Sequence, residues 1–191
     1  MKSVLISIQP KWCELIANGK KTIEVRKTRP KLETPFKCYI YCTKSNKEFL
    51  QSRNNALFYC EDKDFIGGHG VGLYKRLNGK VIGEFVCDKI TMSLVGYNAE
   101  GLPSYWDILD GSCLTPNELV CYGGWKTLYG WHISELVIYD KPKELSEFKM
   151  LCTKNTDCYL CDRYDHIRKD CNSTITRAPQ SWCYVEGAEG K

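Results

Sequence analysis

The chain has 191 residues, of which 43% are hydrophobic and 26% are charged, and its net charge of +4 is unevenly distributed. Residues 1–60 carry 12 Lys and Arg against 4 Asp and Glu, whereas the remainder carries 15 against 19. A basic first third favours an anionic partner such as nucleic acid or a nucleotide, although Lys-rich loops that only keep a protein soluble would give the same count.

No apolar run approaches the ~20 residues that span a bilayer, and the apolar stretch at residues 3–8 is too short for a signal peptide. We therefore expect a cytoplasmic protein with no membrane partner. In a reducing compartment its 12 cysteines are expected to be thiols or metal ligands rather than disulfides.

The first elements are predicted from periodicity and from turn residues. Val4, Ile6 and Ile8 recur at every second position, and this spacing predicts a half-buried strand over 4–8. Pro10 can occupy the first turn of a helix, residues 12–16 place apolar side chains at helical spacing, and Asn18-Gly19 supplies a stop.

Residues 19–26 read G-x-K-x-x-E-x-R and open the next predicted strand. Alternate side chains of a strand share a face, so Thr22, Glu24 and Arg26 are expected on one side and apolar residues on the other. Lys21 lies at the mouth of the strand, where its ammonium can reach that face. An ammonium, a carboxylate and a guanidinium together suit a polar or anionic ligand. The alternative is a solvated strand face with an ordinary Glu–Arg pair.

Further strands are expected over 36–42, 80–90 and 132–139, and a short helix with a capping box is expected over 115–122. The cysteines of these strands (Cys38, Cys42 and Cys87) are expected in the core. The Gly-rich stretch 67–70, which contains His69, reads as a loop without a phosphate-binding context. Several short strands with one or two helices predict an α+β, mainly β fold built as a small β-barrel.

Beyond residue 149 the cysteine spacing changes. Cys152, Cys158, Cys161 and Cys171 could hold a structural zinc ion, with His166 as the alternative to Cys171. A zinc ion would explain how a tail with few aliphatic residues becomes ordered. Two alternatives stay open, namely a metal-free tail with buried thiols and an iron–sulfur cluster.

The motif at 19–26 resembles the signature of the ASCH family (activating-signal-cointegrator homology), a branch of the PUA-like barrels. Gly79–Phe85 is similar to the central strand of that family, Tyr129–Ile133 to its closing strand, and Pro179–Glu186 to the end of a Cys-containing extension in bacterial and phage ASCH proteins. The resemblance implies a PUA-like barrel over 1–145 and a Cys-rich extension over 146–191 packed on it.

The resemblance further implies that the protein binds RNA or a nucleotide. Lys21 and Arg26 would then hold a phosphate or a base carbonyl, and Glu24 would accept a hydrogen bond from a base amino group. Tyr105 and Trp106 are expected to line a wall of the cleft, where they could stack on a base. His132 is expected to border the cleft if the closing strand lies beside the motif strand.

Two other functions stay open. One bacterial branch of the family hydrolyses the amide of N4-acetylcytidine with the motif Lys and a Thr where this chain has Glu24, and Thr22 is the nearest hydroxyl. Lys21 and Glu24 could still act as general acid and base on an amide or on RNA, because burial would lower the pKa of Lys21. The third alternative is a phage or prophage interaction protein that uses its tail to dock a partner.

Overall fold

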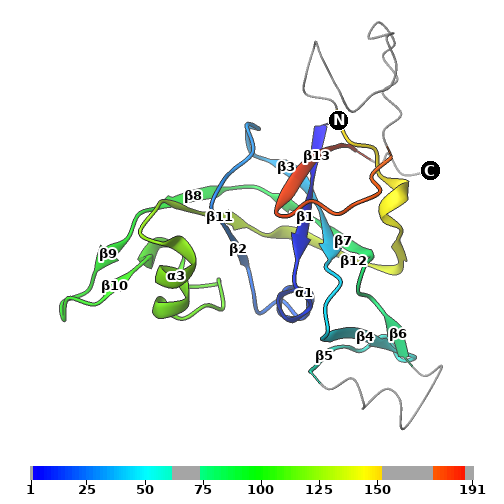
Figure 1. Ribbon diagram of the computed structural model, residues 1–191, viewed down its shortest axis with the longest axis horizontal. Coiled ribbons are helices and arrows are strands. Elements are labelled where there is room, and N and C mark those ends of the chain that lie inside the picture. Colours follow the sequence, from blue (N-terminus) through cyan, green and yellow to red (C-terminus); the bar gives the residue numbers. More distant parts are fainter. Residues whose placement is uncertain (1, 62–73, 152–173, 188–191) are drawn as a thin grey trace, which may run out of the picture.

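The computed structural model describes residues 2–61, 74–151 and 174–187 (Figure 1). Its centre is a five-stranded sheet in the order β12-β7-β3-β1-β13, in which β1 and β3 are parallel and the other pairs antiparallel. The strands of this sheet are β1 (Lys2–Ile8), β3 (Phe36–Cys42), β7 (Val81–Cys87), β12 (Ser134–Lys143) and β13 (Trp182–Glu186).

The inner strands β1 and β3 of the central sheet are buried on both faces. On β3, Phe36, Cys38, Ile40 and Cys42 enter one hydrophobic cluster, and Tyr39 and Tyr41 enter another on the opposite face. The prediction of a half-buried strand over 4–8 is therefore wrong, because β1 is buried at every position after Lys2. The cysteines of the central strands, Cys38, Cys42 and Cys87, lie in the core as expected.

A second sheet carries the sequence motif, with β2 (Ile23–Arg26), β11 (Leu128–His132) and β8 (Ile90–Ser93) in the order β2-β11-β8. Helix α1 (Pro10–Ala17) links β1 to β2 and confirms the predicted start and stop. Gly19, the first residue of the motif, has a φ of 70°, a left-handed conformation that glycine adopts without strain. Its turn directs the chain from the end of α1 into β2.

The peripheral elements project from these two sheets (Figure 1). A three-stranded sheet has the order β5-β4-β6, and β9 and β10 form a hairpin beside α3. The helix α3 has the predicted capping box between Thr115 and Glu118. The peripheral elements are β4 (Glu48–Ser52), β5 (Leu57–Cys60), β6 (Tyr74–Arg76), β9 (Gly96–Tyr97), β10 (Pro103–Ser104), α3 (Pro116–Gly123) and the 3-10 turns η1 (Trp106–Ile108) and η2 (Leu145–Glu147).

The α+β, mainly β class is confirmed, with three corrections of detail. The described strands pair in four separate sheets and do not close into one hydrogen-bonded barrel. The expected strand over 80–90 is divided between β7 and β8, and the one over 132–139 is divided at Ile133. The strand β12 also continues to Lys143, beyond the expected end at 139, and it can include Pro142 because it lies at the edge of the sheet, where a missing N–H is tolerated.

The end of the chain is an integral part of the central sheet, since β13 pairs with β1 over five residue pairs. The division into a domain over 1–145 and an extension over 146–191 stays a prediction, and any boundary must allow for this pairing. The stretch 67–70 lies outside the described residues. Within the described ranges, no helix combines the length and the apolarity needed to cross a bilayer.

Gly83 on β7 allows the close approach of β12. A Cβ atom at this position would lie 2.3 Å from the backbone oxygen of Val137 and 3.1 Å from Cα of Ile138. We expect Gly83→Ala to lower the free energy of unfolding by about 2 kcal/mol, because backbone atoms have to move to make room. Urea unfolding would measure this, with Gly96→Ala as the control, since the nearest atom there is 3.4 Å away. Equal stability of the two variants would contradict the prediction.

Candidate functional site

A cleft of about 460 Å³ opens where the start of α1, the motif strand β2 and the segment before β13 meet. Ligand sites in proteins usually have volumes of about 300–1,000 Å³. The three charged motif residues all line this cleft. The complete lining is Ser7, Ile8, Gln9, Trp12, Lys21, Glu24, Val25, Arg26, Thr43, Leu114, Tyr122, Gln180 and Ser181.

Lys21 is held between the end of α1 and the loop that precedes α3. Its backbone N–H donates to the carbonyl of Leu15, and its Nζ donates to the carbonyl of Ser112 at 2.5 Å. The ammonium is 3% exposed and lies 3.7 Å from Oε2 of Glu24. Burial lowers the pKa of Lys21, and the negative charge of Glu24 partly opposes that shift.

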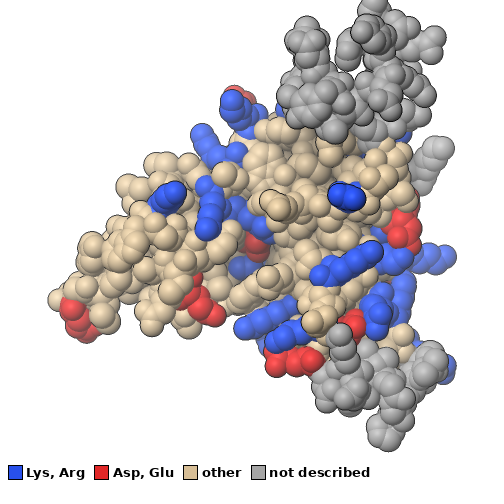
Figure 2. Space-filling model, in the orientation of Figure 1, with Lys and Arg blue, Asp and Glu red and all other residues tan. Residues whose placement is uncertain are grey.

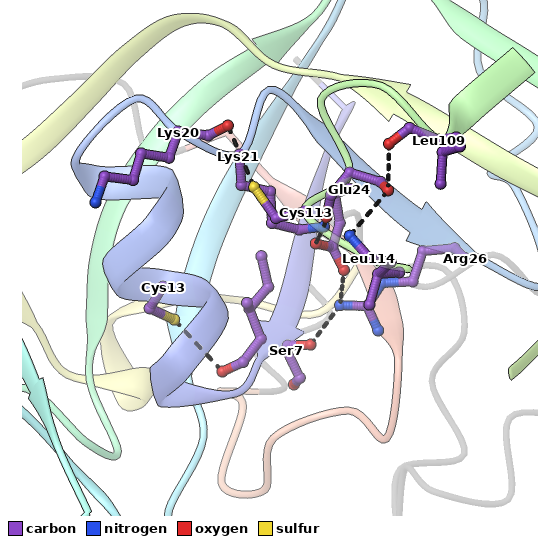
Figure 3. Close-up of polar contacts among 11 residues, drawn as sticks. Ser7, Cys13, Lys20, Lys21, Glu24, Arg26, Leu109, Cys113 and Leu114 are labelled. Carbon is purple, nitrogen blue, oxygen red and sulfur yellow. Dashed lines mark hydrogen bonds and ion pairs between the residues drawn. The ribbon is translucent and has the colours of Figure 1, made fainter. Parts of the chain in front are cut away.

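Glu24 and Arg26 form a buried ion pair, with 3.0 Å between Oε1 of Glu24 and Nη2 of Arg26 (Figure 3). The same Nη2 donates to the carbonyl of Ser7 on β1 at 2.5 Å, and Nη1 donates to Oγ of Ser181 at 3.4 Å. Arg26 therefore joins three segments that are far apart in the sequence. Its fixed fork of donors suits this arrangement better than a flexible ammonium would.

Two buried polar atoms of this network have no hydrogen-bond partner within the described part of the chain, Oε2 of Glu24 and Nε of Arg26. Buried polar groups are nearly always paired, so an exception calls for a physical reason. Here Oε2 of Glu24 lies 3.7 Å from Nζ of Lys21, which is beyond hydrogen-bond distance, and both Glu24 and Arg26 line the cleft. This is the arrangement expected of a site that completes its hydrogen bonds with a ligand.

Two aromatic side chains complete the cleft, Trp12 from α1 and Tyr122 from α3. Nζ of Lys21 lies 5.2 Å from the ring centroid of Trp12, and Nζ of Lys27 lies 4.9 Å from that of Tyr122. Burial raises the pKa of Tyr122, and the charges of Arg26 and Glu24 act on its hydroxyl in opposite directions. The cleft thus combines cations, a carboxylate and flat rings.

Residues 6–91 match the family model of the ASCH domain. The resemblance to the ASCH domain family is confirmed. The match includes the last three residues of β1, all of α1 and the motif strand β2, whereas Tyr122, Gln180 and Ser181 of the cleft lie beyond it. Among curated proteins, none matches the chain.

Solved ASCH structures share the fold. The crystal structure of ASCH from Zymomonas mobilis superimposes with a TM-score of 0.53 at 16% identity, over 96% of this chain and 87% of the other. The structure of a ZmASCH mutant protein from the same organism gives a TM-score of 0.54 at 16% identity, over 96% and 88%. A likeness at this identity establishes the fold alone.

Thr22 is the first predicted site residue that the structure places elsewhere. It is exposed and does not line the cleft. The backbone N–H groups of Thr22 and Ile23 both donate to the carbonyl of Gly111, and β2 begins only at Ile23. Thr22 therefore precedes the strand, and the alternation that places Glu24 and Arg26 together does not extend to it.

The predicted aromatic wall is also corrected. Tyr105 is fully buried in a cluster with Ile108 and Leu119, and its hydroxyl donates to the carbonyl of Lys126 at 2.6 Å. Trp106 is 42% exposed and is not among the lining residues of the cleft. Tyr105 and Trp106 come directly after the β9–β10 hairpin in the sequence and do not line the cleft. The aromatic residues that line it are Trp12 and Tyr122.

His132 does lie on a strand beside the motif strand, as expected, but it faces away from the cleft. In the antiparallel pairing of β11 with β2, Trp131 stands opposite Glu24, and His132 stands opposite Ile23. Residues that stand opposite each other on paired strands have their side chains on the same face of the sheet. His132 therefore shares the face of Ile23 and not that of Glu24 and Arg26. Its Nδ1 lies 2.7 Å from Oδ1 of Asp88, and both side chains are exposed.

Apart from the three charged motif residues, the sequence interpretation named none of the lining residues, and it missed Ser7, Ile8, Gln9, Trp12, Val25, Thr43, Leu114, Tyr122, Gln180 and Ser181. Two of them had a signal, because Gln180 and Ser181 belong to the stretch 179–186 that resembles the end of the family's extension. The predicted zinc ligands Cys152, Cys158, Cys161, Cys171 and His166 all lie outside the described residues. In the described part of the chain, no group of three or more His, Cys, Asp and Glu could hold a metal ion.

The lowered pKa of Lys21 has a consequence for stability. Between the folded pKa and the higher unfolded pKa, the unfolded chain binds more protons, so the free energy of unfolding rises with pH. We expect the difference in stability between the wild type and Lys21→Met to move in favour of the wild type as the pH rises through this alkaline window. Denaturant titrations at several pH values would measure it. The same comparison with Lys20→Met, at an exposed neighbour, should show no such trend.

Proposed function

We propose that the protein binds RNA or a nucleotide-like ligand in the cleft lined by Lys21, Glu24 and Arg26. The observation that carries the proposal is the convergence of buried Lys21, Glu24 and Arg26 on a cleft where Oε2 of Glu24 and Nε of Arg26 lack hydrogen-bond partners among the described residues. A nucleobase offers amino donors and carbonyl acceptors on one edge, which is the complement of this pair.

Each group has a role in such a complex. Glu24 would accept from a base amino group, and Lys21 or Arg26 would donate to a base carbonyl or a phosphate oxygen. Trp12 and Tyr122 would supply faces for stacking, which does not depend on the identity of the base. The site is pre-organised, because Arg26 is already fixed by Ser7 and Ser181.

A hydrolase is the second candidate, and the state of Lys21 favours it. Burial lowers the pKa of Lys21, and its Nζ lies 3.7 Å from the carboxylate of Glu24. A neutral Lys21 could accept a proton from a water molecule that attacks the amide carbonyl of an acetylated cytidine. The protonated amine could then give that proton to the leaving nitrogen, while acetate is released.

Lys21→Met tests both candidates, because methionine keeps most of the buried volume and removes the charge. We expect the wild type to bind cytidine monophosphate or single-stranded RNA saturably in a calorimetric titration. We expect Lys21→Met to weaken that binding by about ten-fold, which corresponds to the loss of one charge-assisted hydrogen bond. Lys20→Met is the matched control, because Lys20 is exposed and adjacent in sequence but outside the cleft.

Incubation of the same proteins with N4-acetylcytidine separates binding from catalysis. Release of acetate by the wild type and its loss in Lys21→Met would make the protein a hydrolase. Saturable binding without acetate release would make it a recognition module. Wild-type protein that neither binds nor hydrolyses these ligands would contradict both candidates.

We also propose that the cysteine-rich tail binds structural zinc, and this proposal rests on the sequence alone. Four thiolates, or three with one imidazole, form a typical structural zinc site. We expect elemental analysis of the purified protein to find about one zinc per chain, and the double variant Cys158→Ser with Cys161→Ser to lose it. Cys121→Ser, at an exposed cysteine of α3, should retain the metal. Wild-type protein without zinc or iron would instead support the metal-free tail.

A further inference from the structure

A pair of exposed aromatic rings lies beyond the cleft, on the arm formed by α3 and the β9–β10 hairpin. Tyr97 is 63% exposed and Trp125 is 57% exposed, and their ring centroids are 6.2 Å apart with an interplanar angle of 36°. We call these two rings the aromatic platform. Large aromatic side chains gain more from burial than almost any other residue, so two adjacent exposed rings are unusual.

The backbone at Trp125 adds a second, independent observation. Gly124 has a φ of 59° and Trp125 a φ of 65°, so two successive residues adopt the left-handed conformation at the end of α3. Glycine adopts this conformation freely, whereas for a bulky residue it is an outlier. Stability alone would favour a glycine at 125 as well. Strain of this kind is found where a side chain is needed in a particular place.

The platform is continuous with the cleft through α3. Tyr122 lines the cleft and stands three residues before Trp125, and α3 lies between β2 and the β9–β10 hairpin (Figure 1). Cations accompany the rings, since Nζ of Lys27 lies 4.9 Å from the ring centroid of Tyr122, and Lys126 is exposed next to Trp125. Figure 2 shows Lys and Arg side chains where the arm joins the body, whereas most of the arm is uncharged.

We propose that the aromatic platform stacks on bases of a single-stranded RNA that also places one nucleotide in the cleft. This inference rests on the proposed function and specifies its ligand as a polynucleotide rather than a free nucleotide. Rings that alternate with cations along a path are typical of single-strand binding surfaces, where the rings stack on bases and the cations contact phosphates.

A protein partner is the competing occupant, because three apolar side chains nearby in the sequence are also exposed, at 58% or more: Met92 on β8, Leu94 directly after β8, and Leu102 directly before β10. RNA is favoured because the platform consists of flat rings, with the exposed Lys126 next to Trp125 and with Lys27 over the ring of Tyr122 nearer the cleft. It is also connected to a cleft that is itself polar and charged. The carboxylate of Glu100 accepts a hydrogen bond from the side-chain amide of Asn98 in the hairpin turn. Its negative charge would repel phosphate groups, so we expect the path of the RNA to end there.

The test compares a mononucleotide with a single-stranded RNA oligonucleotide of the same base, using the full chain. Trp125→Gly removes one platform ring and relieves the backbone strain, so the variant should fold. We expect it to weaken binding of the oligonucleotide by about ten-fold, the effect of losing one stacked base, and to leave mononucleotide binding unchanged. An oligonucleotide with abasic positions outside the cleft should bind the wild type and Trp125→Gly equally. Leu102→Ala, at an exposed aliphatic side chain of the same arm, is the matched control and should change neither affinity.

The fluorescence of Trp125 is obtained as the difference between the wild type and Trp125→Phe. Quenching of this fluorescence by the oligonucleotide but not by the mononucleotide would support the proposal directly. Oligonucleotide and mononucleotide affinities that respond equally to Trp125→Gly would overturn it while leaving the proposed function intact. Failure of the wild type to bind either ligand would overturn both. Self-association in sedimentation that Leu102→Ala and Trp125→Gly both abolish, with no change in RNA affinity, would make the arm a protein interface and also overturn it.

Discussion

Glu24→Ala is expected to destabilise the protein by about 3–5 kcal/mol, because it leaves two buried cations without their counter-charge. The side chains of Lys21, Glu24 and Arg26 are exposed by 3%, 8% and 10%. When one partner of a buried ion pair is removed, the charge of the other stays buried without a counter-charge. Here the single carboxylate of Glu24 is the counter-charge of both Lys21 and Arg26. Urea unfolding monitored by circular dichroism would measure the loss.

The control for this prediction is Glu61→Ala, which breaks an exposed ion pair with Lys47. Exposed pairs contribute little, so this variant should unfold at nearly the same urea concentration as the wild type. A second comparison is the double variant Glu24→Leu with Lys21→Met, which removes a carboxylate and an ammonium together and should recover part of the loss. If Glu24→Ala were as stable as Glu61→Ala, the three charges would not form a coupled network.

Trp182→Ala is expected to cost about 3 kcal/mol of stability and also to weaken ligand binding. Trp182 begins β13, its ring centroid lies 5.9 Å from that of Trp131, and its Nε1 donates to Oγ1 of Thr28. It directly follows Ser181, whose backbone oxygen accepts from Ser7 and whose hydroxyl accepts from Arg26. Losing the ring would therefore loosen a wall of the cleft as well as the core.

Thermal unfolding and calorimetric titration of the same protein would measure the two effects of Trp182→Ala. Trp106→Ala is the control, because Trp106 is also a large partly exposed ring but lies outside the cleft. It should lower the stability less and leave ligand affinity unchanged. Ligand affinity that survives Trp182→Ala at full strength would show that the segment before β13 is only a support for the sheet.

The convergence of Lys21, Glu24 and Arg26 was predictable, because it follows from local rules. Strand alternation places Glu24 and Arg26 on one side, and a long flexible side chain allows Lys21 to reach them. The same rule misplaced Thr22, because the strand begins one residue later. His132, which the family resemblance placed beside the cleft, faces away because the register of β11 sets it opposite Ile23. Sequence periodicity does not fix either quantity.

Residues brought to the cleft by tertiary packing were beyond local rules. Tyr122 comes from a helix whose capping box was recognised, but its direction depends on how α3 packs against the rest of the fold. The same holds for the short strands between residues 43 and 104 and for β13. Their partners are distant in sequence, and short strands carry little periodic signal of their own.

The pairing of β13 with β1 has a consequence for the order of events during synthesis. The hydroxyl of Ser7 donates to the carbonyl of Pro179 across 172 positions of the chain, and Arg26 reaches Ser181 across 155. The ribosome therefore releases β1 and the motif strand long before the residues that complete the sheet and the cleft. Contacts this distant are slow to form, and an uncovered edge of β1 can meanwhile pair with other chains. The cleft described above would be complete only after β13 has been synthesised, so ligand binding would depend on synthesis having passed residue 186.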